Sequence, residues 1–134
     1  PALQDTITDT HLVARDRLGR TIAFLARIFH DRLLPNVEQI YALGIDGGSA
    51  VVVDPDGTAT LLNGKDGHGA YLVRTDTPPR LVPGRPLHYT VEIAHIARDG
   101  ERFDLLDKRT PERWYTITVD GSHSPYYNED PYKQ

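Results

Sequence analysis

The chain has 134 residues, of which 39% are hydrophobic and 25% are charged, and this composition predicts one folded domain with its own apolar core. The formal net charge is -4, whereas proteins that bind a nucleic-acid backbone usually carry a basic surplus, so we expect no DNA partner. The absence of cysteine excludes disulfides, thiolate metal sites and a cysteine nucleophile.

The sequence also lacks the usual membrane signals. No apolar run approaches the roughly 20 residues that a transmembrane helix needs. The first residues, PALQDTITDT, are polar and acidic, and they lack the apolar segment of a signal peptide. We therefore expect a cytoplasmic protein without a membrane partner.

The first long periodic stretch, from Asp9 to Leu34, predicts an amphipathic helix. Its apolar residues recur every three or four positions and would form one stripe. Asp9 or Thr10 can cap its start, and Pro35 should end it. The stripe consists of Leu18, Ile22, Leu25, Phe29 and Leu33.

From Val37 onward the apolar period changes to two and turn residues become frequent, which predicts a sheet over about 37–119. The expected strands are 37–45, 49–53, 58–62, 70–74, 87–97, 102–107 and 113–119. The last three strands should form a meander. The tail, 120–134, should be irregular.

These elements predict an α+β domain that spans residues 1–134. A helix that precedes a run of strands buries its apolar stripe against one face of the sheet. We therefore expect an N-terminal amphipathic helix packed on a curved antiparallel β-sheet.

The segment 63–69, NGKDGHG, is a candidate ligand-binding loop. Lys65 and His68 lie among three glycines, where the backbone can approach a ligand closely and the side chains can meet an anion. The spacing is not that of a Walker loop. The alternative interpretation is a mobile hairpin loop.

The histidines do not form a recognisable metal motif. No pair among the six has a strong metal-ligand spacing, and His88 and His95, seven residues apart on one predicted strand, should point to opposite faces. We therefore expect no bound metal and no cofactor.

Glu92, Arg102 and His123 form the sharpest candidate catalytic group. The glutamate could take a proton from a ribose 2′-hydroxyl, the arginine could stabilise the charge that develops on phosphorus, and the histidine could protonate the leaving oxygen. Their order and spacing, in LHYTVEIAHIARDGERFDLLDKR and WYTITVDGSHSPY, resemble small microbial guanyl-specific ribonucleases.

This resemblance implies a metal-independent endoribonuclease with an RNA substrate. The sequence departs from the family pattern in two ways. Ser122 precedes His123, where the family tends to have an acidic residue, and the family's second arginine has no clean counterpart.

The turn at Asp99-Gly100 decides whether Glu92 and Arg102 can meet. A two-residue loop places these two side chains on opposite faces of the sheet. A three-residue loop with a G1 bulge places them on one face. The two-residue register pairs Ile96 with Phe103 and packs better, so we favour it.

The function that we expect first is a non-catalytic binding module for a small molecule or a partner protein, because no motif rises above chance. The candidate ligand-binding residues are His88, Tyr89, His68 and Lys65. Long strands often pair through their edges, so we also expect that a homodimer can form.

Two enzymatic alternatives stay open. The first is the ribonuclease, the only alternative with an RNA partner. The second is a small acid–base enzyme with a cavity between helix and sheet, in which Glu92, His88 and Tyr89 would face the substrate.

Overall fold

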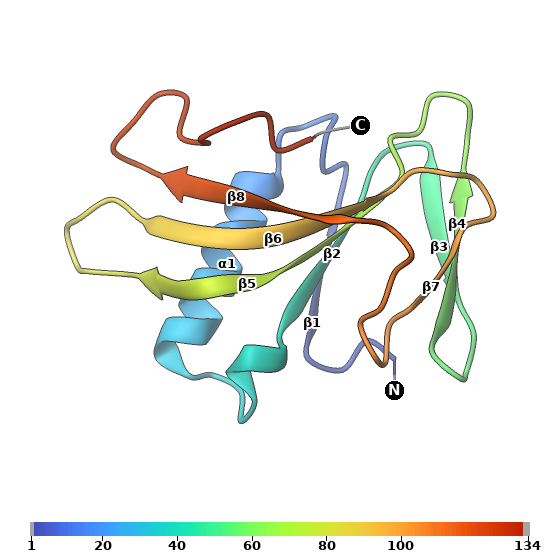
Figure 1. Cartoon of the computed structure of the whole chain (residues 1–134), viewed down its shortest axis with the longest axis horizontal. Coiled ribbons are helices and arrows are strands. Elements are labelled where there is room, and N and C mark those ends of the chain that lie inside the picture. The colour runs from blue at the N-terminus through green and yellow to red at the C-terminus, as the bar shows by residue number, and fades with distance from the viewer. Residues whose placement is uncertain (1, 133–134) are drawn as a thin grey trace.

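The computed structural model describes residues 2–132, and these residues form one α-helix, one short 3-10 helix and eight strands (Figure 1). Residue 1 and the last two residues of the predicted tail lie outside the described part. The helices are α1 (Leu18–Asp31) and η1 (Val37–Gln39). The strands are β1 (Thr6–Thr10), β2 (Tyr41–Ile45), β3 (Ser49–Val53), β4 (Thr58–Asn63), β5 (Ala70–Arg80), β6 (His88–Ile96), β7 (Arg102–Asp104) and β8 (Trp114–Asp120).

The helix packs on a sheet, so the predicted α+β fold class is confirmed. α1 buries Leu18, Ile22 and Leu25 of the predicted stripe. It ends at Asp31, because Arg32 adopts the left-handed conformation of a helix C-cap, with φ 48°.

The predicted start of the helix at Asp9 is wrong. Residues 6–10 form β1, which pairs in parallel with β2. Threonines alternate with Ile7 and Asp9 here, and the β-branched threonine and isoleucine side chains favour an extended backbone. Asp9 meets the helix from that strand, because its carboxylate accepts hydrogen bonds from Arg20 and Thr21.

A five-stranded sheet in the order β1-β2-β5-β6-β8 forms the centre of the fold. Only β1 runs parallel to its neighbour, and the other pairings are antiparallel. β5 continues through Pro78 and Pro79 to Arg80, beyond the predicted strand end at residue 74. The pairing between β5 and β6 shifts register twice in that stretch, which accommodates residues that cannot donate to the ladder.

The predicted meander of the last three strands is wrong, because β7 leaves the large sheet. It pairs with β4, and with β3 these strands form a second sheet in the order β3-β4-β7. The segment between β6 and β7 is held against β4 by two backbone hydrogen bonds. The N–H of Gly100 donates to the carbonyl of Leu61, and the N–H of Leu61 donates to the carbonyl of Glu101. Phe103 is then buried in a second core, so β6 and β7 do not pair and neither predicted register applies.

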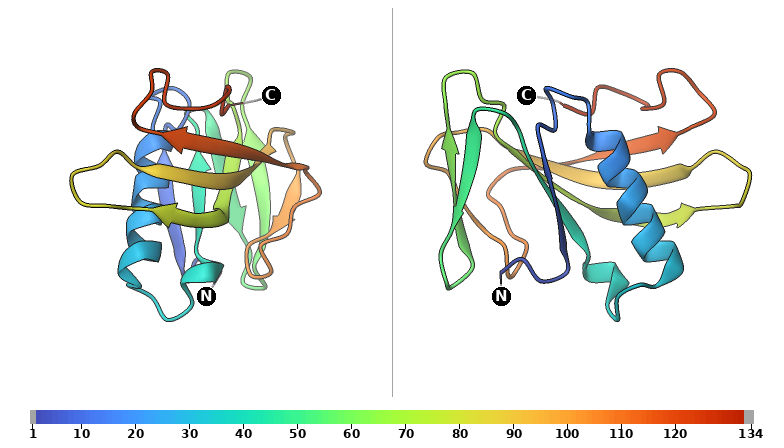
Figure 2. Two further views of the ribbon diagram at one scale, coloured as in Figure 1. Left: turned by 60° about the vertical axis from the view of Figure 1, so that its left-hand side comes forward. Right: turned by 180° about the vertical axis from the view of Figure 1, so that it is seen from behind.

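The large sheet separates two hydrophobic cores. α1 covers one face, where alternate residues such as Tyr89, Val91 and Ile93 of β6 are buried. On the opposite face Ala94 and Ile96 pack against the small sheet. Figure 2 shows the helix and the small sheet on opposite sides of the large one.

The small sheet covers only part of that second face. In Figure 1, β3, β4 and β7 lie at one end, while β5, β6 and β8 extend past them in front of α1. The side-chain alternation places polar residues on this uncovered part, which we term the open face. It comprises Tyr41, Arg74, Arg80, His88, Thr90, Glu92, Trp114, Thr116, Thr118 and Asp120.

The tail after β8 turns back along that strand. Val119 bridges Tyr127, and Asn128 donates its backbone N–H to the carbonyl of Thr118. The hydroxyl of Tyr132 donates to a carboxylate oxygen of Asp16 at 2.6 Å. The tail is irregular, as predicted, but it is packed. No helix in the described residues is long and apolar enough to cross a bilayer.

Candidate functional site

The open face ends in a basic pocket where β5, β6 and β8 lie side by side. Arg80 pairs with His88, and His88 pairs with Asp120, so three neighbouring strands bring these side chains to one end of the sheet. The pocket has a volume of about 430 Å³. Its lining residues are Arg80, Val82, Arg85, Pro86, His88, Asp120 and Ser122, and we term it the Arg–His pocket.

The carboxylate of Asp120 organises one wall of the Arg–His pocket. It accepts hydrogen bonds from the backbone N–H and the hydroxyl of Ser122, and the His123 Nδ1 atom lies 3.2 Å from it. The bonds from Ser122 lower the pKa of the Asp120 carboxyl, and the charges of His123 and His88 lower it further. Both imidazoles therefore lie near a single carboxylate.

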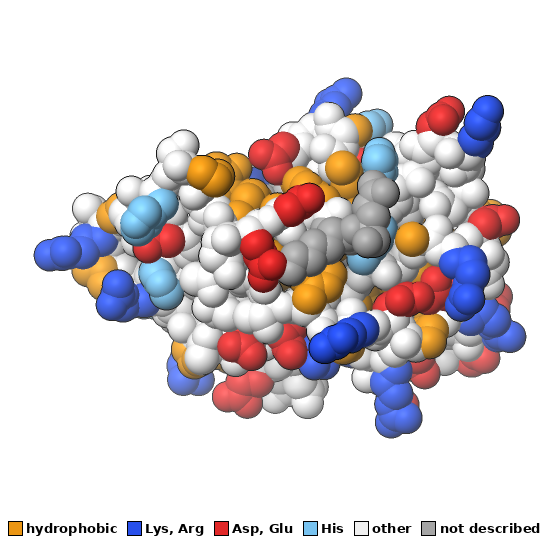
Figure 3. All heavy atoms as spheres, turned by 45° about the horizontal axis from the view of Figure 1, so that its top comes forward, with side chains coloured by type: hydrophobic (Ala, Val, Ile, Leu, Met, Phe, Trp, Pro, Cys, Tyr) orange, Lys and Arg blue, Asp and Glu red, His pale blue; other side chains and the backbone are white. Residues whose placement is uncertain are grey.

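The arginines of this pocket are exposed and face solvent. Among the ion pairs of residues 2–132, none includes Arg80 or Arg85. Two guanidinium groups next to one carboxylate give the pocket a positive charge, although the chain as a whole carries -4. Figure 3 shows basic and histidine side chains gathered around an acidic one at this end of the molecule.

A second polar cluster lies further along the open face. Arg74 donates from Nε to Glu92 Oε2 at 2.6 Å, and its guanidinium carbon lies 4.0 Å from the ring centre of Trp114. Tyr41 contacts the same indole edge-on, with ring centres 6.3 Å apart. The paired hydroxyls of Thr90 and Thr118, 3.0 Å apart, lie between this cluster and the Arg–His pocket.

The predicted catalytic residues lie in three places. Glu92 is in the large sheet, where its cationic partner is Arg74, and Arg102 is in β7 of the small sheet opposite Thr60. His123 lies beyond β8. The structure thus places His123 and His88 near the same carboxylate, that of Asp120. It places Glu92 and Arg102 on separate sheets.

The glycine-rich loop, 63–69, is anchored at both ends. The hydroxyl of Ser49 contacts Asn63 Oδ1 at 2.7 Å and accepts the N–H of Gly69 at 3.0 Å. The His95 ring contacts the carbonyl of His68 at 2.6 Å. A pocket of about 460 Å³ beside the loop is lined by Asn63, Lys65, Asp66, Gly67, His68, His95 and Ala97.

Tyr89, another predicted ligand-binding residue, points into the core between the sheet and α1. It is 1% exposed, and its hydroxyl lies 2.6 Å from that of Thr75. Burial raises the pKa of the Tyr89 phenol. In this position Tyr89 supports the fold, and a ligand on the open face does not reach it.

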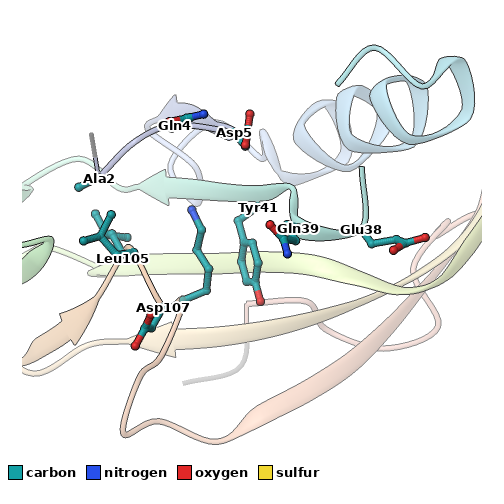
Figure 4. Close-up of a pocket in the computed structure, with 10 residues that line it drawn as sticks. Ala2, Gln4, Asp5, Glu38, Gln39, Tyr41, Leu105 and Asp107 are labelled. Carbon is teal, nitrogen blue, oxygen red and sulfur yellow. The ribbon is translucent and has the colours of Figure 1, made fainter. Parts of the chain in front are cut away.

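A third pocket, of about 470 Å³, is lined by residues that include Tyr41, Asp107 and Lys108. Figure 4 shows Tyr41 and Asp107 at this pocket. The ammonium of Lys108 donates to the hydroxyl of Thr6 at 2.9 Å and lies 5.3 Å from the ring centre of Tyr41. Burial lowers the pKa of Lys108, and the charge of Asp5 opposes this effect. Since Asp5, Glu38 and Asp107 line this pocket with a single lysine, its charge disfavours anions.

Sequence reasoning missed Arg74, Arg80 and Arg85. The last two lie between the predicted strands 70–74 and 87–97, so their approach to His88 was not expected. The available signal was two arginines on either side of a Pro-Gly turn, next to a strand that begins with histidine.

Within the described residues no group of three or more histidine and acidic side chains could hold a metal ion. Comparison of the chain with protein-family models, curated proteins and solved structures gives no match. The function is therefore argued from the site.

Proposed function

We propose that the protein is a binding module for a small molecule that carries a phosphate group, and that this group binds in the Arg–His pocket. The observation that carries the proposal is the meeting of Arg80, Arg85 and His88 at one pocket without an ion-pair partner for either arginine in residues 2–132. A guanidinium presents a planar fork of donors that matches two phosphate oxygens.

The acidic wall of the pocket supports this proposal. Ser122 and His123 hold the Asp120 carboxylate from one side, so its charge is already compensated in part. This compensation would reduce the repulsion between the carboxylate and a ligand phosphate. The homodimer and the cytoplasmic location stay predictions from the sequence.

Titration calorimetry with inorganic phosphate and with uridine 5′-monophosphate tests the proposal. Arg85→Gln removes one donor fork and should weaken binding roughly tenfold or more, since a charged hydrogen bond is worth about 1.5–3 kcal/mol. Arg15→Gln is the matched control, because Arg15 is equally exposed but lies outside the pocket. Equal affinity in the two variants, or no binding by the native protein, would overturn the proposal.

A second candidate function is metal-independent cleavage of RNA. The observation that favours it is that His88 and His123 both act on Asp120, beside two arginines. One imidazole would take the proton of a 2′-hydroxyl as its oxygen attacks phosphorus. The other would protonate the 5′-oxygen as the P–O bond breaks, which leaves a 2′,3′-cyclic phosphate.

The cleavage candidate is tested with RNA in the presence of a metal chelator. Cleavage should yield cyclic-phosphate ends, fall by roughly 100-fold or more in His123→Ala, and be absent with DNA, which lacks the attacking hydroxyl. His30→Ala, an exposed histidine at the end of α1, is the control. Intact RNA, or equal rates in both variants, would exclude this activity.

A further inference from the structure

The uncovered part of the large sheet is a continuous polar surface that joins the Arg–His pocket to the Arg74–Trp114 cluster. The Arg–His pocket lies where His88 pairs with Asp120, and the Arg74–Trp114 cluster lies where Ala94 pairs with Trp114. These pairings are six residues apart along β6, which corresponds to about 20 Å. A ligand that touches both must be longer than a mononucleotide.

The two ends of this surface have complementary chemistry. The Arg–His pocket offers guanidinium groups for a phosphate. At the other end the Arg74 guanidinium covers Trp114, and Arg74 keeps 33% of its side chain exposed. Nucleobases stack on aromatic rings and on guanidinium planes.

Hydroxyl groups occupy the middle of the surface. Thr90 and Thr118 are half-buried and lie between the two ends, where they can exchange hydrogen bonds with a sugar. The carboxylate of Glu92 is also present, but its charge is matched by Arg74. Along β6 the open face therefore offers groups suited to a phosphate, a sugar and a base, in that order.

We infer that the open face binds a short single-stranded RNA, with one phosphate in the Arg–His pocket and a base on the Arg74–Trp114 pair. This inference rests on the proposed function and extends it from one phosphate group to a strand. Because one phosphate is neutralised in the Arg–His pocket, the logarithm of the affinity should fall with the logarithm of salt concentration with a slope of about -0.7.

The experiment compares uridine 5′-monophosphate with an oligouridylate of about six nucleotides, a site size typical for single-stranded nucleic acid. Trp114 is the only tryptophan in the chain, so its fluorescence reports on the far end of the surface. The oligonucleotide should change that fluorescence and bind at least tenfold more tightly, while the mononucleotide should leave the fluorescence unchanged. A deoxyuridylate of the same length measures the contribution of the 2′-hydroxyls.

Arg74→Gln should weaken oligonucleotide binding at least about fivefold, the lower limit for loss of one stacked base, and leave the mononucleotide affinity unchanged. Arg27→Gln is the control, because Arg27 is likewise paired to a carboxylate but lies on α1. Equal affinity for the two ligands with no change at Trp114 would overturn the inference and leave the phosphate site standing. Absence of binding by either ligand would overturn both.

Discussion

Asp9 and Arg20 form an ion pair that joins β1 to α1. Arg20 donates from Nε to Asp9 Oδ2 at 2.8 Å and from a second nitrogen to Oδ1, while Thr21 donates to Oδ2 at 2.9 Å. These bonds, against the opposing effect of burial, lower the pKa of Asp9 to about 2. The Asp9 side chain is 9% exposed and that of Arg20 is 48% exposed, so solvent screens the pair in part.

Asp9→Asn should lower the free energy of unfolding at neutral pH by about 1–3 kcal/mol, because it removes a charged hydrogen-bond partner. The pKa of Asp9 is lower in the folded state, so its stabilisation is complete above pH 3.8 and is lost as the pH falls toward 2. Urea titrations from pH 7 to 2 measure this. Asp66→Asn, on an exposed loop, should follow the native curve; a native-like Asp9→Asn curve would contradict the argument.

Glu101→Gln should stabilise the protein. Glu101 is 4% exposed, its Oε1 atom has no hydrogen-bond partner among the described residues, and burial and the neighbouring Glu112 raise its pKa. A raised pKa in the folded state means that the ionised form costs stability as the pH rises above the ordinary value. Thermal melts at pH 7 should show a higher Tm than that of the native protein, and an unchanged or lower Tm would contradict the argument. Glu112→Gln removes only the neighbour's contribution and should gain less.

Gly69→Ala should destabilise the fold strongly. A Cβ at this position would lie 2.1 Å from the carbonyl oxygen of Ile96, and the backbone has φ +81°. Gly84 has φ +73° but open space around it, so Gly84→Ala isolates the conformational cost, about 1 kcal/mol. We expect roughly 3 kcal/mol or more for Gly69→Ala in denaturant unfolding. Equal losses in the two variants would show that the close contact is absent.

Tyr132→Phe should loosen the tail. The phenol donates to Asp16, so its loss should cost about 1 kcal/mol. Amide exchange should become faster at Asn128, whose N–H bonds Thr118 of β8, and stay unchanged at Val73 in the centre of the sheet. Tyr126→Phe removes a longer bond to the same carboxylate, at 3.5 Å, and should change the exchange rate less. Unchanged exchange at Asn128 would mean that the tail is held by other contacts.

The local patterns predicted most strands and the centre of the helix, because side-chain alternation and turn residues act over a few positions. The predicted strands 49–53 and 58–62, for example, correspond to β3 and β4, which pair with each other. The prediction for the first residues was wrong, because an aspartate before an apolar stripe is typical of a helix cap. Here Asp9 instead contacts the helix from a neighbouring strand.

The partner of β7 could not be predicted, because pairing of distant strands depends on which apolar faces need cover. The two-residue register would pair Phe103 with Ile96 on neighbouring strands. In the structure the two residues lie on different sheets, and both side chains are buried in the core between those sheets. Among the site residues, His88 and His123 were identified by residue type. The positions of Arg80 and Arg85 at the site could be predicted only from the pairing of β5 with β6. The prolines in this stretch do not indicate such a pairing.

The returning tail covers part of one edge of the large sheet, at β8. Residues Tyr126–Asn128 take up backbone groups of Thr118–Asp120, so a further strand cannot add along that stretch of β8. The opposite side of the sheet ends in β1. We therefore expect an added strand to pair with β1 more readily than with that stretch of β8, and two copies joined through β1 about a twofold axis would make a closed pair.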